Sequence, residues 1–333
     1  MEVDTPKARA VGRTFLLCTC YIATSASLIR FNKFLMHPDR FPYSMFLTSV
    51  HMFTSGLLCL LLYFVRPSLF PGLANCEGKR DTVLKWIAPI ASLFALSLYA
   101  SNQAYLYCNV TFLQFMKEAN VIIAFLISCA AGLQEMSGVR LGILVWIIMG
   151  SAMAVSGEVH FVLHGFLFQA VSQLAECMRV VMGEVVLKGG GLNLDPLSYT
   201  LLIAPACLGY LLVGVAATWN PAIPQALAIW WPYILPNACL AFVMNLLVAT
   251  IIKEISSIGF ILTGVCKDIA IVIFSAVVAG EHVTGFQRVS FTVTFAGVSF
   301  WSYLKLRPGG PPSEATGKAT ESTTLMRRAP DKV

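Results

Sequence analysis

The chain has 333 residues, of which 57% are hydrophobic and only 12% are charged. A soluble globular domain carries about twice that charged fraction, so the composition indicates an integral membrane protein and excludes a soluble enzyme with an added anchor. The net charge of +6 does not indicate nucleic-acid binding. The basic residues lie in loops, tails and isolated apolar segments rather than on one continuous face.

Apolar stretches predict an all-α integral membrane protein with ten transmembrane helices, because about 20 apolar residues cross a bilayer and the loops are short. The predicted spans are, in order, residues 14–34, 43–65, 86–107, 111–132, 139–157, 160–187, 195–218, 230–252, 257–279 and 284–304. Residues 1–13 form a polar N-terminal segment before them. Residues 307–333 are rich in Pro, Gly, Ser, Thr and charge, which predicts a disordered tail.

The distribution of Lys and Arg predicts the orientation. Basic residues gather in the N-terminal segment, in residues 66–85 and beyond residue 305, so the positive-inside rule places both termini in the cytosol. The first span lacks a cleavage site of small residues, and we expect it to be an uncleaved signal anchor. The segment before it does not resemble a transit peptide, so Golgi or another endomembrane is expected rather than the plastid.

Two of the predicted spans carry a similar pair of charges. The fourth reads FMKEANVII around Lys117, and the ninth reads VCKDIAIVI around Lys267. These spans are offset by an odd number, so equivalent helices run in opposite directions through the membrane. This is typical of two inverted five-helix repeats with a substrate site near the midplane. The repeats would cover about residues 14–157 and 160–304.

The two lysines are candidate site residues, because a charge inside hydrocarbon costs about 2.5–3.5 kcal/mol on insertion scales and usually faces a water-filled path. Lys is a compact point charge that can bind phosphate. Gln114 and Asn120 lie near Lys117 on its helix, and Thr263 precedes Lys267 by one turn. The alternative is a structural role, in which each lysine forms a buried ion pair.

The sixth predicted span has a polar stripe with Arg179 near its middle. At about 100° per residue, one side of this helix collects Gln169, Ser172, Gln173, Glu176, Arg179, Gly183 and Glu184. The planar donor fork of Arg suits a carboxylate or phosphate, so Arg179 is a candidate anion contact. The alternative is an internal ion pair with Glu176, one turn away.

Three further polar residues are weaker candidates for substrate contacts. Tyr99 and Asn102 belong to the third span and could stack on or hydrogen-bond a sugar or base, although Tyr is also common at the membrane interface. Asn245 shares one side of the eighth span with Asn237. Hydrogen bonding between helices explains that pair equally well.

No enzyme signature is present in the chain. It has no Gly-rich phosphate loop, no GxSxG and no HExxH, so no catalytic activity and no cofactor are expected. The ten cysteines show no CxxC pair and are interpreted as small apolar packing residues. His160 and His164 have metal-ligand spacing but no clear third ligand, so we interpret them as a solvated pair at a helix end.

Three segments carry a resemblance to a known family: SNQAYLYCNVTFLQFMKEAN at 101–120, AECMRVVMGEVVLKGGGLNLDP at 175–196 and GFILTGVCKDIAIVIFSAVVAGE at 259–281. They resemble the nucleotide-sugar and triose-phosphate translocators of the drug/metabolite transporter superfamily, near the Lys-Asp subgroup of plant and algal members. The resemblance implies ten helices, two inverted repeats and strict exchange. It also implies that Lys117, Arg179 and Lys267 hold the substrate phosphate.

One departure from that family is Asp268, because phosphate-exchanging plastid members have Arg after the ninth-helix Lys. This departure removes a phosphate ligand of those members and argues against triose-phosphate/phosphate exchange. The resemblance as a whole implies an antiporter that exchanges a sugar phosphate or nucleotide-sugar for phosphate or a nucleoside monophosphate. The alternative is a proton-coupled exporter of amines or amino acids on the same fold, in which Glu118 or Asp268 titrates. The expected partners are a small anionic phosphorylated substrate, membrane lipid and, as an open option, a second copy of the chain.

Overall fold

The computed structural model describes residues 5–108, 113, 116–117, 119–155, 162–278 and 285–306, and the regular structure in these ranges is helical. Gln114, Glu118, His160 and the tail at 307–333 lie outside them. Two short 3-10 helices, η1 (Pro67–Leu69) and η2 (Pro71–Cys76), connect α2 to α3. The α-helices are α1 (Thr5–Leu35), α2 (Ser44–Val65), α3 (Arg80–Tyr107), α5 (Asn120–Ala130), α6 (Gly138–Val155), α7 (Leu163–Lys188), α8 (Pro196–Ala217), α9 (Ile223–Glu254), α10 (Ser257–Val278) and α11 (Gly285–Leu306).

Five helices of the described residues are long and apolar enough to cross a membrane, within α1, α2, α3, α8 and α9. Shorter apolar helices lie within α5, α6, α10 and α11. Helices α1, α3 and α9 begin several residues before the spans predicted from hydrophobicity. At α1 and α3 the additional residues include several charged ones, which can continue a helix beyond the hydrocarbon core, so hydropathy alone does not mark where these two helices start.

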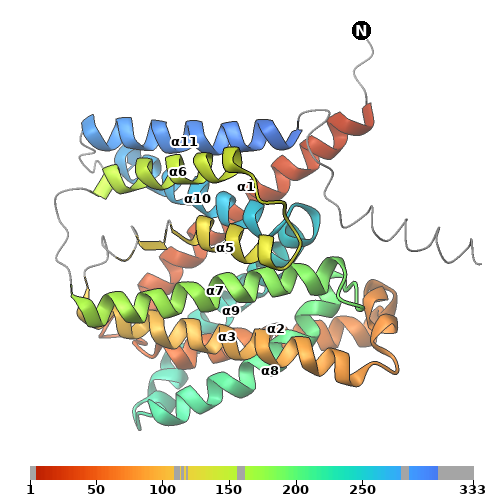
Figure 1. Cartoon of the computed structure of the whole chain (residues 1–333). Coiled ribbons are helices and arrows are strands. Elements are labelled where there is room, and N and C mark those ends of the chain that lie inside the picture. Colours follow the sequence, from red (N-terminus) through yellow and green to blue (C-terminus); the bar gives the residue numbers. More distant parts are fainter. Residues whose placement is uncertain are drawn as a thin grey trace, which may run out of the picture.

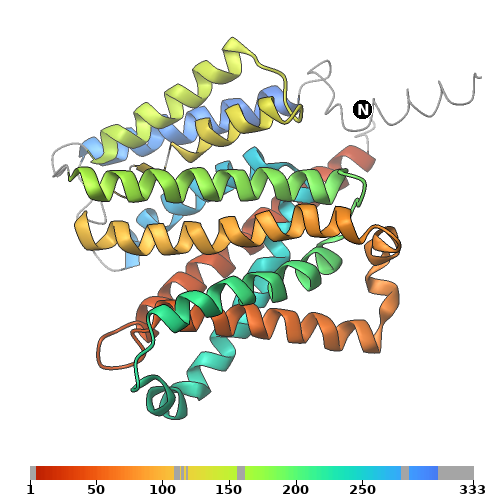
Figure 2. The ribbon, with the colours of Figure 1, turned by 60° about the horizontal axis from the view of Figure 1, so that its bottom comes forward.

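The helices pack in an ordered series that can be followed from one end of the bundle to the other (Figure 1). Helices α6 and α11 pack together at the top of that view, and α2 packs against α8 at the bottom. Between these pairs, α3 lies along α7 and α1 along α9, as a second view also shows (Figure 2). Helices α5 and α10 contact each other and join the central helices to the α6–α11 pair.

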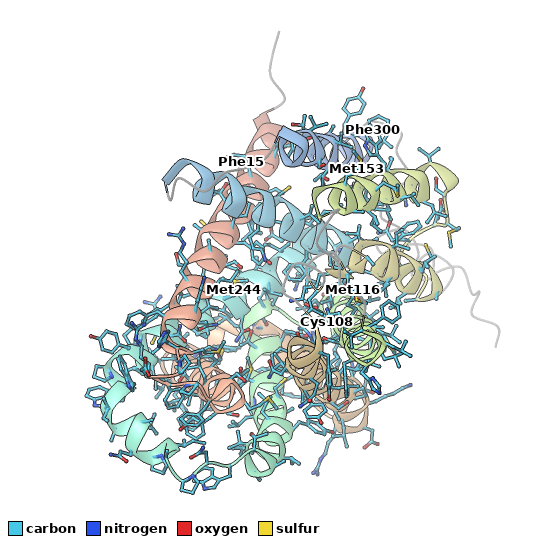
Figure 3. All side chains as sticks on the ribbon, turned by 90° about the vertical axis from the view of Figure 1, so that its left-hand side faces the viewer. Phe15, Cys108, Met116, Met153, Met244 and Phe300 are labelled. Atoms are coloured by element: carbon cyan, nitrogen blue, oxygen red, sulfur yellow. The ribbon has the colours of Figure 1, made fainter. Side chains whose placement is uncertain are left out.

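The outer surface of the bundle is apolar. Phe15 is 74% exposed and Phe64 is 72% exposed, whereas water-soluble proteins seldom display such large apolar surfaces. Phe15 on α1 and Phe300 on α11 are among these exposed side chains (Figure 3). A lipid environment explains this pattern, since helices satisfy their own backbone hydrogen bonds in hydrocarbon and can present apolar side chains to it.

Asp195 fixes the start of α8 and also holds the α2–α3 connection. Its carboxylate accepts a hydrogen bond from the Ser198 backbone N–H at 3.0 Å, which caps the helix, and another from the Gly72 N–H at 2.8 Å. Pro196 occupies the first helical position, as is favoured at helix starts. A side chain at Gly72 would collide with the Asp195 backbone and carboxylate, so the close approach requires glycine there.

We expect Asp195→Ala to lower the free energy of unfolding by about 2 kcal/mol, because it removes a helix cap and leaves the Gly72 N–H without its acceptor. Thermal unfolding in detergent measures the change. Asp39→Ala is the control, since Asp39 is exposed and pairs only with the exposed His37 among the described residues. Equal stability of the two variants would contradict the role of Asp195.

Candidate functional site

Helix α7 turns its polar side into the bundle. Gln169 is 1% exposed and Gln173 is 2% exposed, whereas Leu167 and Leu174 on the other side are about half exposed. The helix ends after Lys188, and Gly190 and Gly191 follow with φ of 62° and 81°. A lipid-facing apolar side and a buried polar side are what a helix that lines a polar path requires.

Polar side chains of α5 and α7 meet in a short hydrogen-bonded chain. Gln173 Nε2 donates to Asn120 Oδ1 at 2.9 Å and also to the Met116 carbonyl oxygen. Asn120 Nδ2 donates in turn to Glu176 Oε2 at 3.4 Å. Two neighbouring helices thus share one buried polar cluster, and the predicted site residue Asn120 lies at its centre.

Arg179 projects from α7 with part of its guanidinium group unsatisfied. Its Nε is buried and has no hydrogen-bond partner among the described residues, and its Cζ lies 5.1 Å from the centre of the Phe94 ring on α3. The described part of the chain shows no ion pair between Arg179 and Glu176. A half-buried cation with an unused donor is suited to an anionic ligand.

Lys117 and Lys267 lie on helical segments that belong to the same region. Both are half-buried. Lys117 precedes the first residue of α5, and Lys267 lies near the middle of α10. Helix α5 contacts both α7 and α10, so the helices that carry Arg179 and Lys267 both adjoin the helix that begins three residues after Lys117. The side chain of Asp268 lies outside the described residues, as do Gln114 and Glu118.

Two other predicted residues hydrogen-bond within or between helices. Thr263 Oγ1 donates to the Gly259 carbonyl of its own helix at 2.8 Å, and lies 3.7 Å from Cys18 Sγ of α1. Asn245 Nδ2 donates to Ser55 Oγ at 3.1 Å and so connects α9 to α2. For Asn245 this contact corresponds to the alternative of interhelical hydrogen bonding.

Tyr99 and Asn102 line a cavity of about 190 Å³ between α2, α3, α8 and α9. Asn102 Nδ2 donates to Ser44 Oγ at 3.3 Å and lies 3.7 Å from Met45 Sδ. The described residues that line this cavity do not include Arg179 or the residues of the α5–α7 cluster. The structure therefore does not bring Tyr99 and Asn102 together with Arg179 in one cavity.

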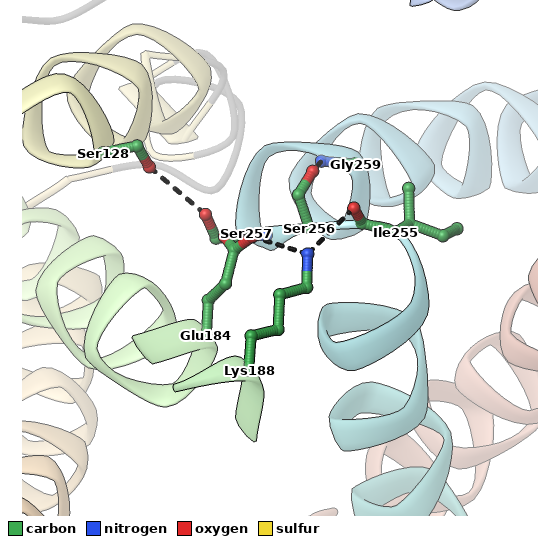
Figure 4. A network of polar contacts seen from close by, with 7 residues as sticks. All are labelled: Ser128, Glu184, Lys188, Ile255, Ser256, Ser257 and Gly259. Atoms are coloured by element: carbon green, nitrogen blue, oxygen red, sulfur yellow. Dashed lines mark hydrogen bonds and ion pairs between the residues drawn. The ribbon is translucent and has the colours of Figure 1, made fainter. Parts of the chain in front are cut away.

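The ends of α5 and α7 meet the start of α10 in a second polar network (Figure 4). Glu184 accepts the backbone N–H of Ser257 at 2.7 Å and pairs with Lys188 Nζ at 2.8 Å. Lys188 also donates to the Ile255 carbonyl at 3.2 Å, and Ser128 Oγ lies 3.2 Å from Ser257 Oγ. A buried carboxylate at a helix N-terminus stabilises that helix start, so this network fastens three helices together.

Sequence reasoning placed Gln169 in the polar stripe without proposing it as a site residue. In the structure both Nε2 and Oε1 of Gln169 are buried and have no hydrogen-bond partner in the described part of the chain. The signal available in the sequence was its position on the same side as Glu176. The missing information was which members of the stripe find partners within the protein.

A helical bundle with an apolar exterior and buried polar side chains between its helices is typical of a multi-pass integral membrane protein. The sequence profile of the Triose-phosphate Transporter family matches residues 12–302, and the chain belongs to this family. It is a family of transporters and not of enzymes. The family resemblance expected from the three sequence segments is thereby confirmed.

Relatives from Arabidopsis thaliana are similar over most of their length. One probable sugar phosphate/phosphate translocator is 27% identical over 291 residues, covering 86% of this chain and 82% of the relative. Another of the same description is 29% identical over 306 residues, covering 90% and 88%. A solved crystal structure shares the fold with a TM-score of 0.64 and 11% identity, covering 88% of this chain and 97% of that one.

Proposed function

We propose that this protein is a secondary antiporter that exchanges a sugar phosphate or nucleotide-sugar for phosphate or a nucleoside monophosphate. The observation that carries the proposal is the half-buried Arg179, whose Nε is buried and has no hydrogen-bond partner among the described residues. The relatives described as sugar phosphate/phosphate translocators support a phosphorylated anion as its ligand. Lys117 and Lys267, on the neighbouring segments, would neutralise the rest of the phosphate charge.

The helix packing supports two inverted repeats, residues 14–157 and 160–304, as the moving parts. The symmetry of the packing can be tested by replacing each helix with its equivalent in the other repeat. The equivalent pairs are α1 and α7, α2 and α8, α3 and α9, α5 and α10, and α6 and α11. The packed pair α3–α7 then becomes α1–α9, α3–α8 becomes α2–α9, and α5–α7 becomes α1–α10, all of which pack in the structure. The pairs α2–α8, α5–α10 and α6–α11 are unchanged by this exchange. Such an arrangement suits alternating access by rocking one repeat against the other.

Strict exchange follows when the loaded carrier changes state more easily than the empty one. Without an anion, closure would bring the positive charges on these neighbouring segments together, and their mutual repulsion would oppose it. A bound phosphate neutralises them and favours the occluded state. The basic loops and tails support an orientation with both termini in the cytosol. Golgi or another endomembrane stays the predicted compartment.

Counterflow in proteoliposomes tests the proposal. Vesicles preloaded with unlabelled phosphate should take up labelled phosphate or sugar phosphate, and vesicles without internal substrate should not. Uptake that needs a pH gradient and no internal phosphorylated solute would contradict the antiporter and support proton coupling. Preloading with individual nucleoside monophosphates extends the same measurement to nucleotide-sugar exchange.

A further inference from the structure

Several side chains on the buried polar side of α7 have hydrogen-bond partners. Ser172 Oγ donates to the Ser97 carbonyl at 2.7 Å, Gln173 bonds to Asn120, and Glu176 accepts from Asn120. Buried polar groups in folded proteins are almost always paired in this way. A buried group that stays unpaired therefore requires an explanation, such as a ligand that the chain itself does not supply.

Gln169 is the residue on the buried polar side of α7 that most needs such an explanation. Its side chain is 1% exposed, and neither its amide nitrogen nor its amide oxygen has a partner among the described residues. A carboxamide offers two donors and two acceptor positions, so it suits a hydroxyl group, which both donates and accepts. A buried apolar cluster that contains Ala104, Leu113 and Met116 packs against Phe168 and Ala170, the residues on either side of Gln169 in the sequence of α7.

The spacing between Gln169 and Arg179 limits the ligand that could contact both. Ten residues of α-helix separate their Cα atoms by about 15 Å along the axis, and the two positions differ by about 80° around it. Both side chains lean toward the helix N-terminus, so their polar ends remain about as far apart as their Cα atoms. Two hydrogen bonds of about 2.9 Å each leave about 9 Å for the ligand itself. A three-carbon phosphate is shorter than this, whereas a pentose or hexose phosphate reaches it.

We propose that Gln169 is a specificity-determining residue that binds a hydroxyl group of a phosphorylated sugar with five or more carbons, while Arg179 binds its phosphate. This inference rests on the proposed function and deepens it, because it assigns the opposite end of the same ligand. Inorganic phosphate and three-carbon phosphates contact Arg179 without reaching Gln169. The selectivity among phosphorylated sugars thus depends on a neutral residue about three turns from the cation.

The test compares Gln169→Leu with the unchanged protein in proteoliposomes preloaded with phosphate. Three external substrates are used: labelled phosphate, a triose phosphate and a hexose phosphate. We expect the KM for the hexose phosphate to rise about tenfold, as for the loss of one or two neutral hydrogen bonds. The KM values for phosphate and triose phosphate should stay within about twofold. Thermal stability should not fall, because leucine replaces two unpaired polar atoms with apolar ones of similar size.

Gln173→Leu is the matched control, one turn further along α7. It removes a residue whose amide is paired, so it should lower thermal stability and affect all three substrates alike. Equal changes for all substrates in Gln169→Leu, or none for the hexose phosphate, would overturn the inference and leave the antiporter intact. Phosphate exchange without any hexose phosphate uptake by the unchanged protein would also overturn it. Failure of the unchanged protein to exchange any phosphorylated solute would refute the proposed function itself.

Discussion

Replacing Arg179 with Gln is expected to reduce kcat/KM for phosphate exchange by about 100-fold, with little change in thermal stability. Charge-assisted hydrogen bonds contribute about 1.5–3 kcal/mol each, and a bidentate pair therefore accounts for at least two powers of ten. Stability should change little, since Arg179 Nε has no hydrogen bond to lose among the described residues. Its described contact is the stacking on Phe94, which contributes about 1 kcal/mol.

Two further variants sharpen this experiment. Arg179→Lys keeps the charge and loses the planar fork, so it should recover only part of the exchange activity. Arg140→Gln is the control for removing an arginine, because Arg140 donates to Gln134 at 3.0 Å near the start of α6 and has no assigned contact with substrate. Full exchange by Arg179→Gln in sealed vesicles would refute its role as the anion contact.

Replacing Glu184 with Ala is expected to lower the free energy of unfolding by about 3 kcal/mol. The change leaves Lys188 without its carboxylate, at 19% side-chain exposure, and removes the acceptor of the Ser257 N–H at the start of α10. Breaking one side of a buried ion pair costs about this much, because the remaining charge stays desolvated. Loss of monodisperse protein on heating in detergent measures the effect.

Substitution of Lys188 separates the two contributions of Glu184, which are the ion pair with Lys188 and the hydrogen bond from the Ser257 N–H. Lys188→Met removes the ion pair and leaves the carboxylate at the α10 start, whereas Glu184→Ala removes both contacts. The double variant should therefore be more stable than Glu184→Ala alone. Glu254→Ala is the matched control, since it breaks the more exposed pair with Arg13, and such pairs contribute at most about 1 kcal/mol. Equal losses for Glu184→Ala and Glu254→Ala would contradict the fastening role.

Much of the α7 polar side could be predicted from sequence, because a helical period of 3.6 assigns residues to sides without any knowledge of neighbours. The pairing of those residues could not. Gln173 is paired because Asn120 of α5 reaches it, whereas Gln169 has no hydrogen-bond partner among the described residues. The periodicity of one helix contains no information about the helix opposite.

The lack of information about contacts between helices also explains why other predictions were only partly confirmed. Hydrophobicity found the apolar stretches, but it could not show that Asn102 faces Ser44 on α2 in a separate cavity. The predicted span 195–218 begins within one residue of the start of α8, whereas the contact of Asp195 with Gly72 joins positions far apart in the chain. The roles of Lys117 and Lys267 stay predictions.

The connections α2–α3 and α7–α8 are joined at three points: Gly72 to Asp195 at 2.8 Å, Asn75 to Asn193 at 3.5 Å and Lys79 to Gly191 at 2.9 Å. One connection belongs to each proposed repeat. In the proposed rocking of the repeats, these three hydrogen bonds would make the two loops move together. Spectroscopic labels on the two loops would report no change in the distance between the loops during turnover. The pair of loops is therefore a fixed reference for measuring the movement of other helices.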